Sequence, residues 1–469
     1  MTKPAHFSVA AVLAAALLAG CSMAPAYQRP VAPVADEYAT NPSGTGVLAA
    51  DTSWRSYFTD PHLQQLIAAA LEHNRDLRTA ALRMQEARAL YDVQSADRLP
   101  TVNGSVAVTR AKTAAFLSSS GQNTIGKRYD VGLSVMAFEL DFFGRVKSLS
   151  DAALASYLAT DEARQAAQIA LVAQVAQAYY TERSYAEQQS LAEQTYQARK
   201  RTYQLTQQRA EVGASSLLDL RSNETLMETA RAAALTLARQ RAQAENALTL
   251  LVGQPSTAQA AHDSKLPSDA QLDAMSALPA GLPSDLLERR PDIRAAEQRL
   301  QAANANIGAA RAAFFPRISL TAGLGSSSPS LQGLFDSGSG SWAFAPQLVQ
   351  PIFDAGRNRA NLSISEVRKD IAIADYEKAI QTAFREVADA LAARDYLGEQ
   401  VAAQRAVQDA QADRLRLLQL RQENGVASAL DVLDAQRELF NAQQSLVQAR
   451  LLRATSAIDL YRALGGGLK

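Results

Sequence analysis

The feature that most constrains this chain is a very long segment without helix breakers. No glycine or proline occurs between Gly144 and Gly213, and none occurs between Gly213 and Gly253. The segment is rich in Ala, Gln, Arg, Glu and Leu, so it predicts continuous helices over about 144–211 and 215–252. At a rise of 1.5 Å per residue the first helix would be roughly 100 Å long. Because Gly213 can adopt a positive φ and reverse the chain, the sequence predicts a long antiparallel helical hairpin.

This helical hairpin occurs twice in the sequence. The landmark residues Gly144, Gly213 and Gly253 recur 212 positions later as Gly356, Gly425 and Gly465, and Leu71, Asp76, Arg83 and Pro100 recur 216 positions later as Leu287, Asp292, Arg299 and Pro316. The second copy therefore predicts helices over about 356–423 and 427–464. An internal repeat of this length indicates duplication of a whole structural unit. We divide the chain into a first repeat (61–253), a connector (254–282), a second repeat (283–465) and a C-terminal tail (466–469).

Each repeat also contains two segments in which apolar and polar residues alternate. This period of two predicts strands at about 101–113 and 127–142, and again at about 316–327 and 341–354. The expected fold class is therefore mainly α, with two repeats that each contain a β-hairpin and a long helical hairpin. Four strands leave two open edges, which a lipid environment does not tolerate. Three chains would supply twelve strands, the smallest closed set with room for a pore, although the edge of a soluble sandwich remains the alternative.

The N-terminus predicts a lipoprotein. Lys3 precedes an apolar run that is too short to span a bilayer and that ends in Leu-Ala-Gly-Cys21, the only cysteine of the chain. This pattern is typical of a signal peptide (1–20) and resembles the bacterial lipoprotein cleavage box, in which the cysteine is acylated. The proline-rich start of 21–60 predicts an extended, lipid-anchored tether that leads into an equatorial segment. The alternative is a buried cysteine that happens to follow a signal peptide.

The composition argues against several classes of function. The 47 acidic and 47 basic residues give a net charge of zero, so no bulk field attracts nucleic acid. The four histidines, His6, His62, His73 and His262, are scattered. We find no nucleophile–base set, no glycine-rich phosphate loop and no spacing of metal ligands. We therefore expect no enzyme activity, no cofactor, no metal site and no nucleic-acid partner.

A set of motifs carries a family resemblance. Three lie at the predicted joints between strands and helices, namely Glu139 to Arg145, Ala312 to Pro316 and Pro351 to Arg357, and Leu433 to Arg437 and the closing Leu464 to Gly467 complete the set. Together they resemble the TolC-like outer membrane efflux factors, most closely the NodT/OprM-type lipoproteins that serve RND pumps. The resemblance extends over essentially the whole mature chain, with the duplication in register.

The resemblance implies a homotrimer with a 12-stranded β-barrel in the outer membrane and an α-helical tunnel in the periplasm. The tether, the connector and the C-terminus would form a belt around the middle of the tunnel. It further implies a passive exit duct for small molecules, either drugs or other toxic compounds. An inner-membrane RND-type pump would deliver them through a periplasmic adaptor (membrane fusion) protein.

Two groups of residues are candidates for function. The hairpin tips are Arg209, Val212, Gly213, Ala214 and Ser215 in the first repeat and Arg421, Gly425, Val426 and Ala427 in the second. Helix-stop chemistry accounts for both tips, and the resemblance implies that they contact the adaptor.

The second group is Leu430, Asp431, Asp434 and Arg437. Asp431 and Asp434 are three residues apart and share a helix face, so a trimer would place six carboxylates around one opening. The alternative is a solvated helix flank with an ordinary Asp434–Arg437 pair. The resemblance implies a periplasmic gate at Leu430, Asp434 and Arg437. The first repeat has Ser222 and Thr225 at the matching positions, so the gate is expected to be one-sided.

Other readings remain open at this point. Within the channel class, the chain could be a duct for type I protein secretion or for metal efflux. Outside it, the chain could be a structural periplasmic coiled-coil lipoprotein, although such a spacer needs no strands. Gly398 interrupts the second long helix where the first has Ala186, and it either marks a bend or weakens the helix.

Overall fold

The computed structural model describes residues 22–35, 37–38, 48–119, 121–255, 266–279 and 283–468. The chain divides into two compact units. One contains 1–31, 83–160 and 295–376, and the other contains 32–82, 161–294 and 377–469. The expected signal peptide and the expected lipidation site, Cys21, lie outside the described residues.

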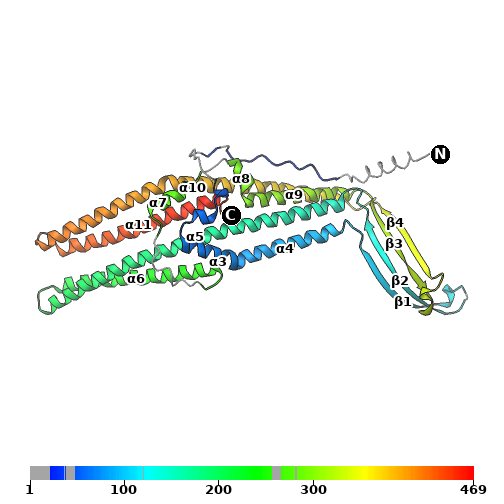
Figure 1. The fold of residues 1–469 in the computed structure, drawn as a ribbon, viewed down its shortest axis with the longest axis horizontal. Helices are drawn as coiled ribbons and strands as arrows, with labels where there is room; N and C mark the ends of the chain where they lie inside the picture. Colours follow the sequence, from blue (N-terminus) through cyan, green and yellow to red (C-terminus); the bar gives the residue numbers. More distant parts are fainter. Residues whose placement is uncertain are drawn as a thin grey trace. The chain divides into compact units, whose positions relative to one another are not determined.

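Four long helices make up somewhat less than half of the chain (Figure 1). Helices α5 (Arg145–Glu211) and α10 (Arg357–Glu423) each have 67 residues, and they are followed by α6 (Leu217–Val252) and α11 (Ala429–Ala463). All four begin and end within two residues of the expected positions. Helix α10 continues through Gly398, where an added Cβ would lie 3.8 Å from Arg453 Nη2, an ordinary contact. No close approach therefore requires a glycine at this position.

The shorter helices are α2 (Trp54–Tyr57), α3 (Pro61–His73), α4 (Arg75–Ala96), α7 (Asp269–Ser276), α8 (Pro283–Arg289) and α9 (Pro291–Ala312), with short 3₁₀ helices η1 (Ala49–Asp51), η2 (Ala115–Leu117) and η4 (Gln332–Phe335). Side chains cap the starts of α2, α3, α4 and α7, namely those of Ser53, Asp60, Asn74 and Ser268. Asp60 caps α3 by accepting hydrogen bonds from the backbone N–H groups of His62 and Leu63. Among the helices of the described ranges, none is both long and apolar enough to cross a membrane.

Helix α7 lies inside the segment that the sequence analysis treats as a connector. Ser268 and Gln271 form a capping box at its start, and Leu272 and Met275 are buried. Ion pairs from Arg453 to Asp273 and from Arg405 to Asp269 hold α7 against the α10–α11 hairpin. Helix α7, the part of the connector that these contacts involve, is therefore packed within the second unit.

The first unit contains a four-stranded antiparallel sheet in the order β1-β2-β3-β4 (Figure 1). Its strands are β1 (Val102–Thr113), β2 (Thr124–Glu139), β3 (Arg317–Ser328) and β4 (Gly340–Val349). The register places apolar residues opposite apolar ones, such as Val102 opposite Val135, and polar ones opposite polar ones, such as Asn103 opposite Ser134. The alternation in the sequence thus predicts the two faces of the sheet correctly. Within the described residues β1 and β4 are edge strands that pair on one side only.

The ends of β2 and β4 differ from the prediction. Strand β2 both begins and ends three residues earlier than expected, and β4 stops at Val349 rather than near 354. A bulge between Val135 and Phe138, with Ala137 at φ 50°, inserts one residue and leaves Phe138 opposite Leu320. Strand β4 passes through Pro346, which an edge strand tolerates, and it ends two residues before Pro351.

The segment after Cys21 is not a free tether. Arg29 donates two hydrogen bonds to the carboxylate of Glu297 on α9, at 2.8 and 2.9 Å, and the Tyr27 hydroxyl donates a third at 3.0 Å. Asn304, two turns further along α9, donates to the carbonyl oxygen of Pro25 at 2.7 Å. Residues 25–29 are therefore held along α9 within the first unit, because side chains of α9 pair with the proline-rich backbone.

In the second unit, the breaks between the short helices repeat the same contact. The side chain of Asn74, between α3 and α4, donates to the carbonyl oxygen of Leu251 at 2.8 Å. Arg290, between α8 and α9, occupies the equivalent place and donates to the carbonyl oxygen of Ala463 at 3.1 Å. In both repeats a side chain at the break thus fastens the end of the returning long helix.

Each returning helix ends at a glycine that approaches the same break. Gly253 and Gly465 have φ of 80° and 82°. A Cβ on Gly253 would lie 2.4 Å from the carbonyl oxygen of His73, and one on Gly465 would lie 3.3 Å from that of Arg289. Positive φ and close approach both require glycine here, so these residues are structural landmarks of the duplication.

We expect Arg290→Ala to destabilise the protein by about 2–3 kcal/mol, because it leaves Glu386 partly buried with a single distant partner. Arg290 is 8% exposed and pairs with Asp292 at 2.5 Å and with Glu386 at 2.9 Å. After the substitution Glu386 would keep only Arg462, at 3.7 Å. Urea unfolding of the detergent-solubilised protein measures this loss.

The neighbouring Arg289 provides the matched control. It pairs with Asp51 at 2.7 Å, but both side chains are more than a third exposed. Arg289→Ala should therefore change the free energy of unfolding by less than about 1 kcal/mol. Equal unfolding midpoints for the two variants would contradict the role assigned to Arg290.

Candidate functional site

The two long hairpins of the second unit reverse in the same way. Gly213 and Gly425 have φ of 74° and 75°, and their N–H groups donate to the carbonyl oxygens of Ala210 and Gln422. A Cβ on either glycine would meet nothing within 4 Å. The positive φ alone, rather than crowding, explains why the sequence has glycine at both tips.

Most of the candidate tip residues are exposed. Arg209, Val212, Gly213, Ala214, Arg421, Gly425 and Val426 are exposed, whereas Ser215 and Ala427 are half-buried. The valines are 78% and 66% exposed, and Leu217, Leu218 and Leu430 are exposed beside them. Each tip therefore presents a small apolar surface with an arginine at its edge, which is a chemistry suited to packing against another protein.

Asp431 is a helix-capping residue. Its carboxylate accepts hydrogen bonds from the hydroxyl and the backbone N–H of Ser428, at 2.7 and 3.0 Å, and its own N–H donates to Ser428 Oγ. The Ser428 hydroxyl is the main cause of the lowered pKa of Asp431. The first repeat has the same pair, Ser216 and Asp219. Capping thus accounts for this aspartate in both repeats.

Asp434 belongs to a different group of charges. It pairs with Arg437 one turn further along α11 and with Arg414 on α10, where Nη2 and Oδ2 are 3.5 Å apart. Arg437 also pairs with Glu438 at 3.0 Å. We call Asp434, Arg437, Glu438 and Arg414 the Asp434 network. At the matching positions the first repeat has only the uncharged residues Ser222, Thr225, Leu226 and Thr202, so the network is one-sided, as expected.

Arg199 of α5 is a neighbour of this network that the sequence analysis missed. Its side chain is buried, Nη1 donates to the carbonyl oxygen of Leu226 at 3.1 Å, and Nε has no hydrogen-bond partner among the described residues. Burial is the main cause of its lowered pKa, and the positive charge of Arg437 is the second. An arginine in a long polar helix usually lies on a solvated face, so the local sequence gave no signal for this placement.

A groove at the second hairpin brings tip and gate candidates together. It has a volume of about 850 Å³ and is lined by Arg421 and Val426 of the tip and by Arg414 and Asp431. Leu417 and other leucines of α10 supply its apolar lining. The groove therefore combines an apolar surface with fixed charges at one end of the helical hairpin.

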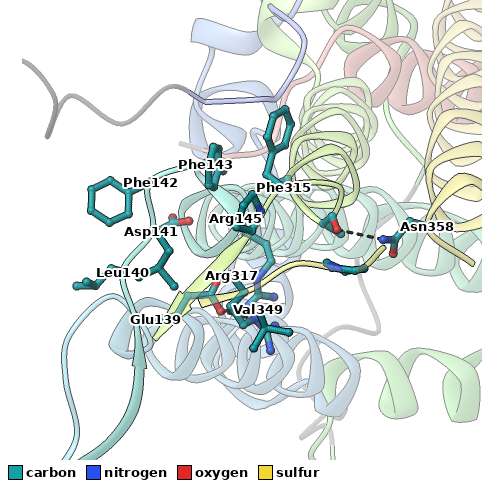
Figure 2. Close-up of a pocket in the computed structure, with 15 residues that line it drawn as sticks. Glu139, Leu140, Asp141, Phe142, Phe143, Arg145, Phe315, Arg317, Val349 and Asn358 are labelled. Carbon is teal, nitrogen blue, oxygen red and sulfur yellow. Dashed lines mark hydrogen bonds and ion pairs between the residues drawn. The ribbon is translucent and has the colours of Figure 1, made fainter. Parts of the chain in front are cut away.

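The joint motifs converge in the first unit, around a cavity of about 230 Å³ (Figure 2). Glu139 accepts two hydrogen bonds from Arg145, at 2.8 and 2.7 Å, and pairs with Arg317 at 3.0 Å. The rings of Phe143 and Phe315 stack with their centroids 4.8 Å apart. The bidentate pair and the stacked rings fix the passage from strand to helix, and this is the role we assign to the motifs.

The described residues offer no metal centre. Within the described ranges, no group of three or more His, Cys, Asp or Glu residues is placed to hold a metal ion. Of the four histidines, His62 and His73 lie in these ranges, and His6 and His262 lie outside them.

The sequence is similar to known efflux proteins over its whole length. A family model described as outer membrane efflux protein matches residues 66–254 and 282–466, once in each repeat. The outer membrane protein OprJ of Pseudomonas aeruginosa is 48% identical over 468 residues, which cover 100% of this chain and 97% of OprJ. The toluene efflux pump outer membrane protein TtgC of Pseudomonas putida is 48% identical over 456 residues, which cover 96% of this chain and 93% of TtgC.

Solved structures show the same fold. A membrane protein from Pseudomonas aeruginosa superposes with a TM-score of 0.87 at 47% identity, covering 95% of this chain and 100% of that chain. The open state of the MtrE outer membrane channel of Neisseria gonorrhoeae gives 0.85 at 42% identity, covering 96% and 99%. Both matches are long enough to include the sheet and the long helices of both repeats.

Proposed function

This chain belongs to the outer membrane efflux protein family, and from that premise we propose that three copies form the outer-membrane exit duct of a tripartite efflux pump. Its partners would be a periplasmic adaptor and an inner-membrane RND-type pump. The family consists of channels rather than enzymes, so the duct is passive. Relatives are named as outer membrane proteins of antibiotic, toluene and solvent efflux pumps, and we propose cargo of the same kind, small toxic compounds.

The sheet is the observation that best supports a shared barrel. One face carries exposed apolar side chains such as Val106, Trp342 and Phe344, and the other carries small or polar ones such as Asn103 and Ser134. An exposed apolar face is costly in water, whereas it suits a lipid bilayer. Each edge strand can pair with the opposite edge of another copy, and three copies would give twelve strands around a polar lumen.

The candidate sites take their places in this assembly. We propose that Cys21 carries the lipid anchor and that residues 25–29, held on α9, lead the chain from the anchor into the belt. We propose that the exposed tip residues contact the adaptor. The Asp434 network, with Leu430 and Asp431 beside it on α11, would form the periplasmic gate.

Mass measurement and planar-bilayer recording of the purified protein test this function together. We expect a mass of three chains in detergent by light scattering, and a small single-channel conductance in a phosphatidylcholine bilayer. We also expect the gene to restore toluene or antibiotic tolerance to a strain that lacks its own channel. A monomer that does not conduct would overturn the proposal and favour a structural spacer.

A further inference from the structure

Three cations lie at the far end of the β1–β2 hairpin, on the apolar face of the sheet. Arg110 and Lys112 continue the row of Val106 and Val108 along β1, and Lys127 is the register partner of Arg110 on β2. We call Arg110, Lys112 and Lys127 the basic cluster. Its side chains are exposed, and it lies at the end of the sheet opposite to the joints with the helices (Figure 1).

The charges of the basic cluster are not neutralised by the part of the chain that the structure describes. None of its three side chains makes an ion pair with any residue that the structure describes. The adjacent Arg128 points to the other face of the sheet and behaves differently, because its Nε donates to Asp130 at 2.7 Å and to Ser327 at 3.1 Å. The polar face thus balances its charge locally, whereas the apolar face leaves three positive charges at its edge.

A groove on the same face lies further along the strands, with the Val108–Tyr129 pair between it and the basic cluster. It has a volume of about 710 Å³ and is lined mainly by apolar groups, among them Val106, Leu133, Leu324, Trp342 and Phe335 of the loop helix η4. Gly104 and Gly340 also line the groove, and the absence of their side chains helps to leave it open. An apolar groove in line with a set of cations on the same face suits an amphiphile that has an acyl chain and a negatively charged head.

We propose that this face binds a phosphorylated glycolipid of the outer leaflet, with its phosphate on the basic cluster and an acyl chain in the groove. The inference rests on the proposed function, because a barrel in the outer membrane places this face in lipid. The end of the sheet opposite to the helices then lies in the outer leaflet, since the helices extend into the periplasm. Lysine and arginine bind phosphate through charge-assisted hydrogen bonds, and Trp342 has the amphipathic ring typical of a membrane interface.

Binding of lipid A to the full-length trimer in phosphatidylcholine nanodiscs tests the proposal. Each cation near an anionic lipid surface contributes about fivefold, so Arg110→Ser/Lys112→Ser/Lys127→Ser should weaken binding on the order of 100-fold. Dephosphorylated lipid A should bind the unaltered protein just as weakly. Affinities for the triple variant within threefold of those for the unaltered protein would overturn the proposal.

Two control variants test the roles of charge and of position. The first conserves the three charges, and the second removes a charge from the opposite face of the sheet. Arg110→Lys/Lys112→Arg/Lys127→Arg keeps the three charges and should bind lipid A normally. Arg128→Ser removes a charge from the opposite face and should also bind it normally. Phosphatidylglycerol is the second lipid to measure, and an affinity equal to that of lipid A would overturn the assignment to an outer-leaflet glycolipid.

Conductance in a bilayer without lipid A separates this inference from the proposed function. The triple variant should assemble and conduct as the unaltered protein does, because the basic cluster lies outside the lumen and the gate. An unaltered protein that neither trimerises nor conducts would refute both proposals. A conducting protein whose lipid A binding does not depend on the basic cluster would refute only the lipid site.

Discussion

Replacing Gly425 by aspartate should abolish export, whereas replacing it by asparagine should leave most of the export intact. Both residues tolerate a positive φ better than other side chains do, at a cost of about 1 kcal/mol or less. Both would project into open space, because a Cβ at this position meets nothing within 4 Å. The two variants therefore differ mainly in charge. A carboxylate beside the exposed Val426 and Leu430 would have to lose its hydration when the adaptor packs on the tip.

Toluene or antibiotic tolerance of a strain with the pump but without its own channel measures this difference. The aspartate variant should give the tolerance of an empty vector while still running as a trimer in detergent. Adaptor pull-down by each variant is the direct measurement. Retention of the adaptor by the aspartate variant would show that this tip does not contact the adaptor. If the asparagine variant lost the adaptor equally, the cause would be a change in backbone conformation rather than the added charge.

The first tip gives an independent version of the same experiment. Gly213 has the same φ and the same open surroundings as Gly425, and Val212 and Leu218 are exposed beside it. Gly213→Asp should abolish export and Gly213→Asn should not, if adaptors occupy both kinds of hairpin around the trimer. Loss at only one tip would show that the adaptor uses one hairpin type.

Local sequence patterns predict the long elements well because their ends carry strong signals. Helix α5 ends just before Gly213 and α6 just before Gly253, and both glycines have the positive φ that stops a helix. The alternation of apolar and polar residues predicts which face of β1 and β2 is apolar. The signal is strong because a shift of one residue would turn every side chain to the opposite face of the sheet. Duplication doubles each of these signals.

Local sequence patterns did not predict the β-bulge, which depends on one extra residue, or the contacts between residues far apart in the sequence. The bulge before Phe138 changes the end of β2 although the residues around it keep strand propensity. Arg290 fastens the carbonyl of Ala463, which lies 173 positions away in the sequence. The burial of Arg199 likewise depends on how α5 packs against other helices. The spacing of Asp431 and Asp434 made Asp431 a gate candidate, whereas the hydrogen bonds from Ser428 reveal its capping role.

Asp434→Asn should open the proposed gate, and Arg437→Gln should not. The Asp434 network and Arg199 together hold two carboxylates and three guanidinium groups, an excess of one positive charge. Asp434→Asn raises this excess positive charge. It removes the carboxylate that lies among the guanidinium groups of Arg437, Arg414 and Arg199, so these groups repel one another. Arg437→Gln removes the excess and leaves Asp434 paired with Arg414. Asp434→Asn therefore favours separation of the hairpins and an open gate, whereas Arg437→Gln favours the closed gate.

The expected effect is modest for each subunit because the ion pairs are partly solvated. Asp434 and Arg437 are 38% and 56% exposed, so we expect about 1 kcal/mol, or about fivefold in the open-to-closed ratio, for each copy. Three copies acting on one opening would multiply this ratio, which single-channel recording detects as a larger or more persistent conductance. Asp431→Ala is the variant for comparison, since it removes the other carboxylate of the proposed gate, together with a helix cap, and leaves the Asp434 network in place.

Salt concentration distinguishes charge repulsion from loss of helix structure as the cause of opening. The Debye length falls from about 10 Å at 0.1 M salt to about 3 Å at 1 M, so repulsion among the three guanidinium groups should weaken. The conductance of Asp434→Asn should then approach that of the unaltered protein at high salt. An increase that persists at 1 M salt, or an equal increase in Arg437→Gln, would contradict an electrostatic gate and leave only local unfolding of the start of α11 to explain the opening.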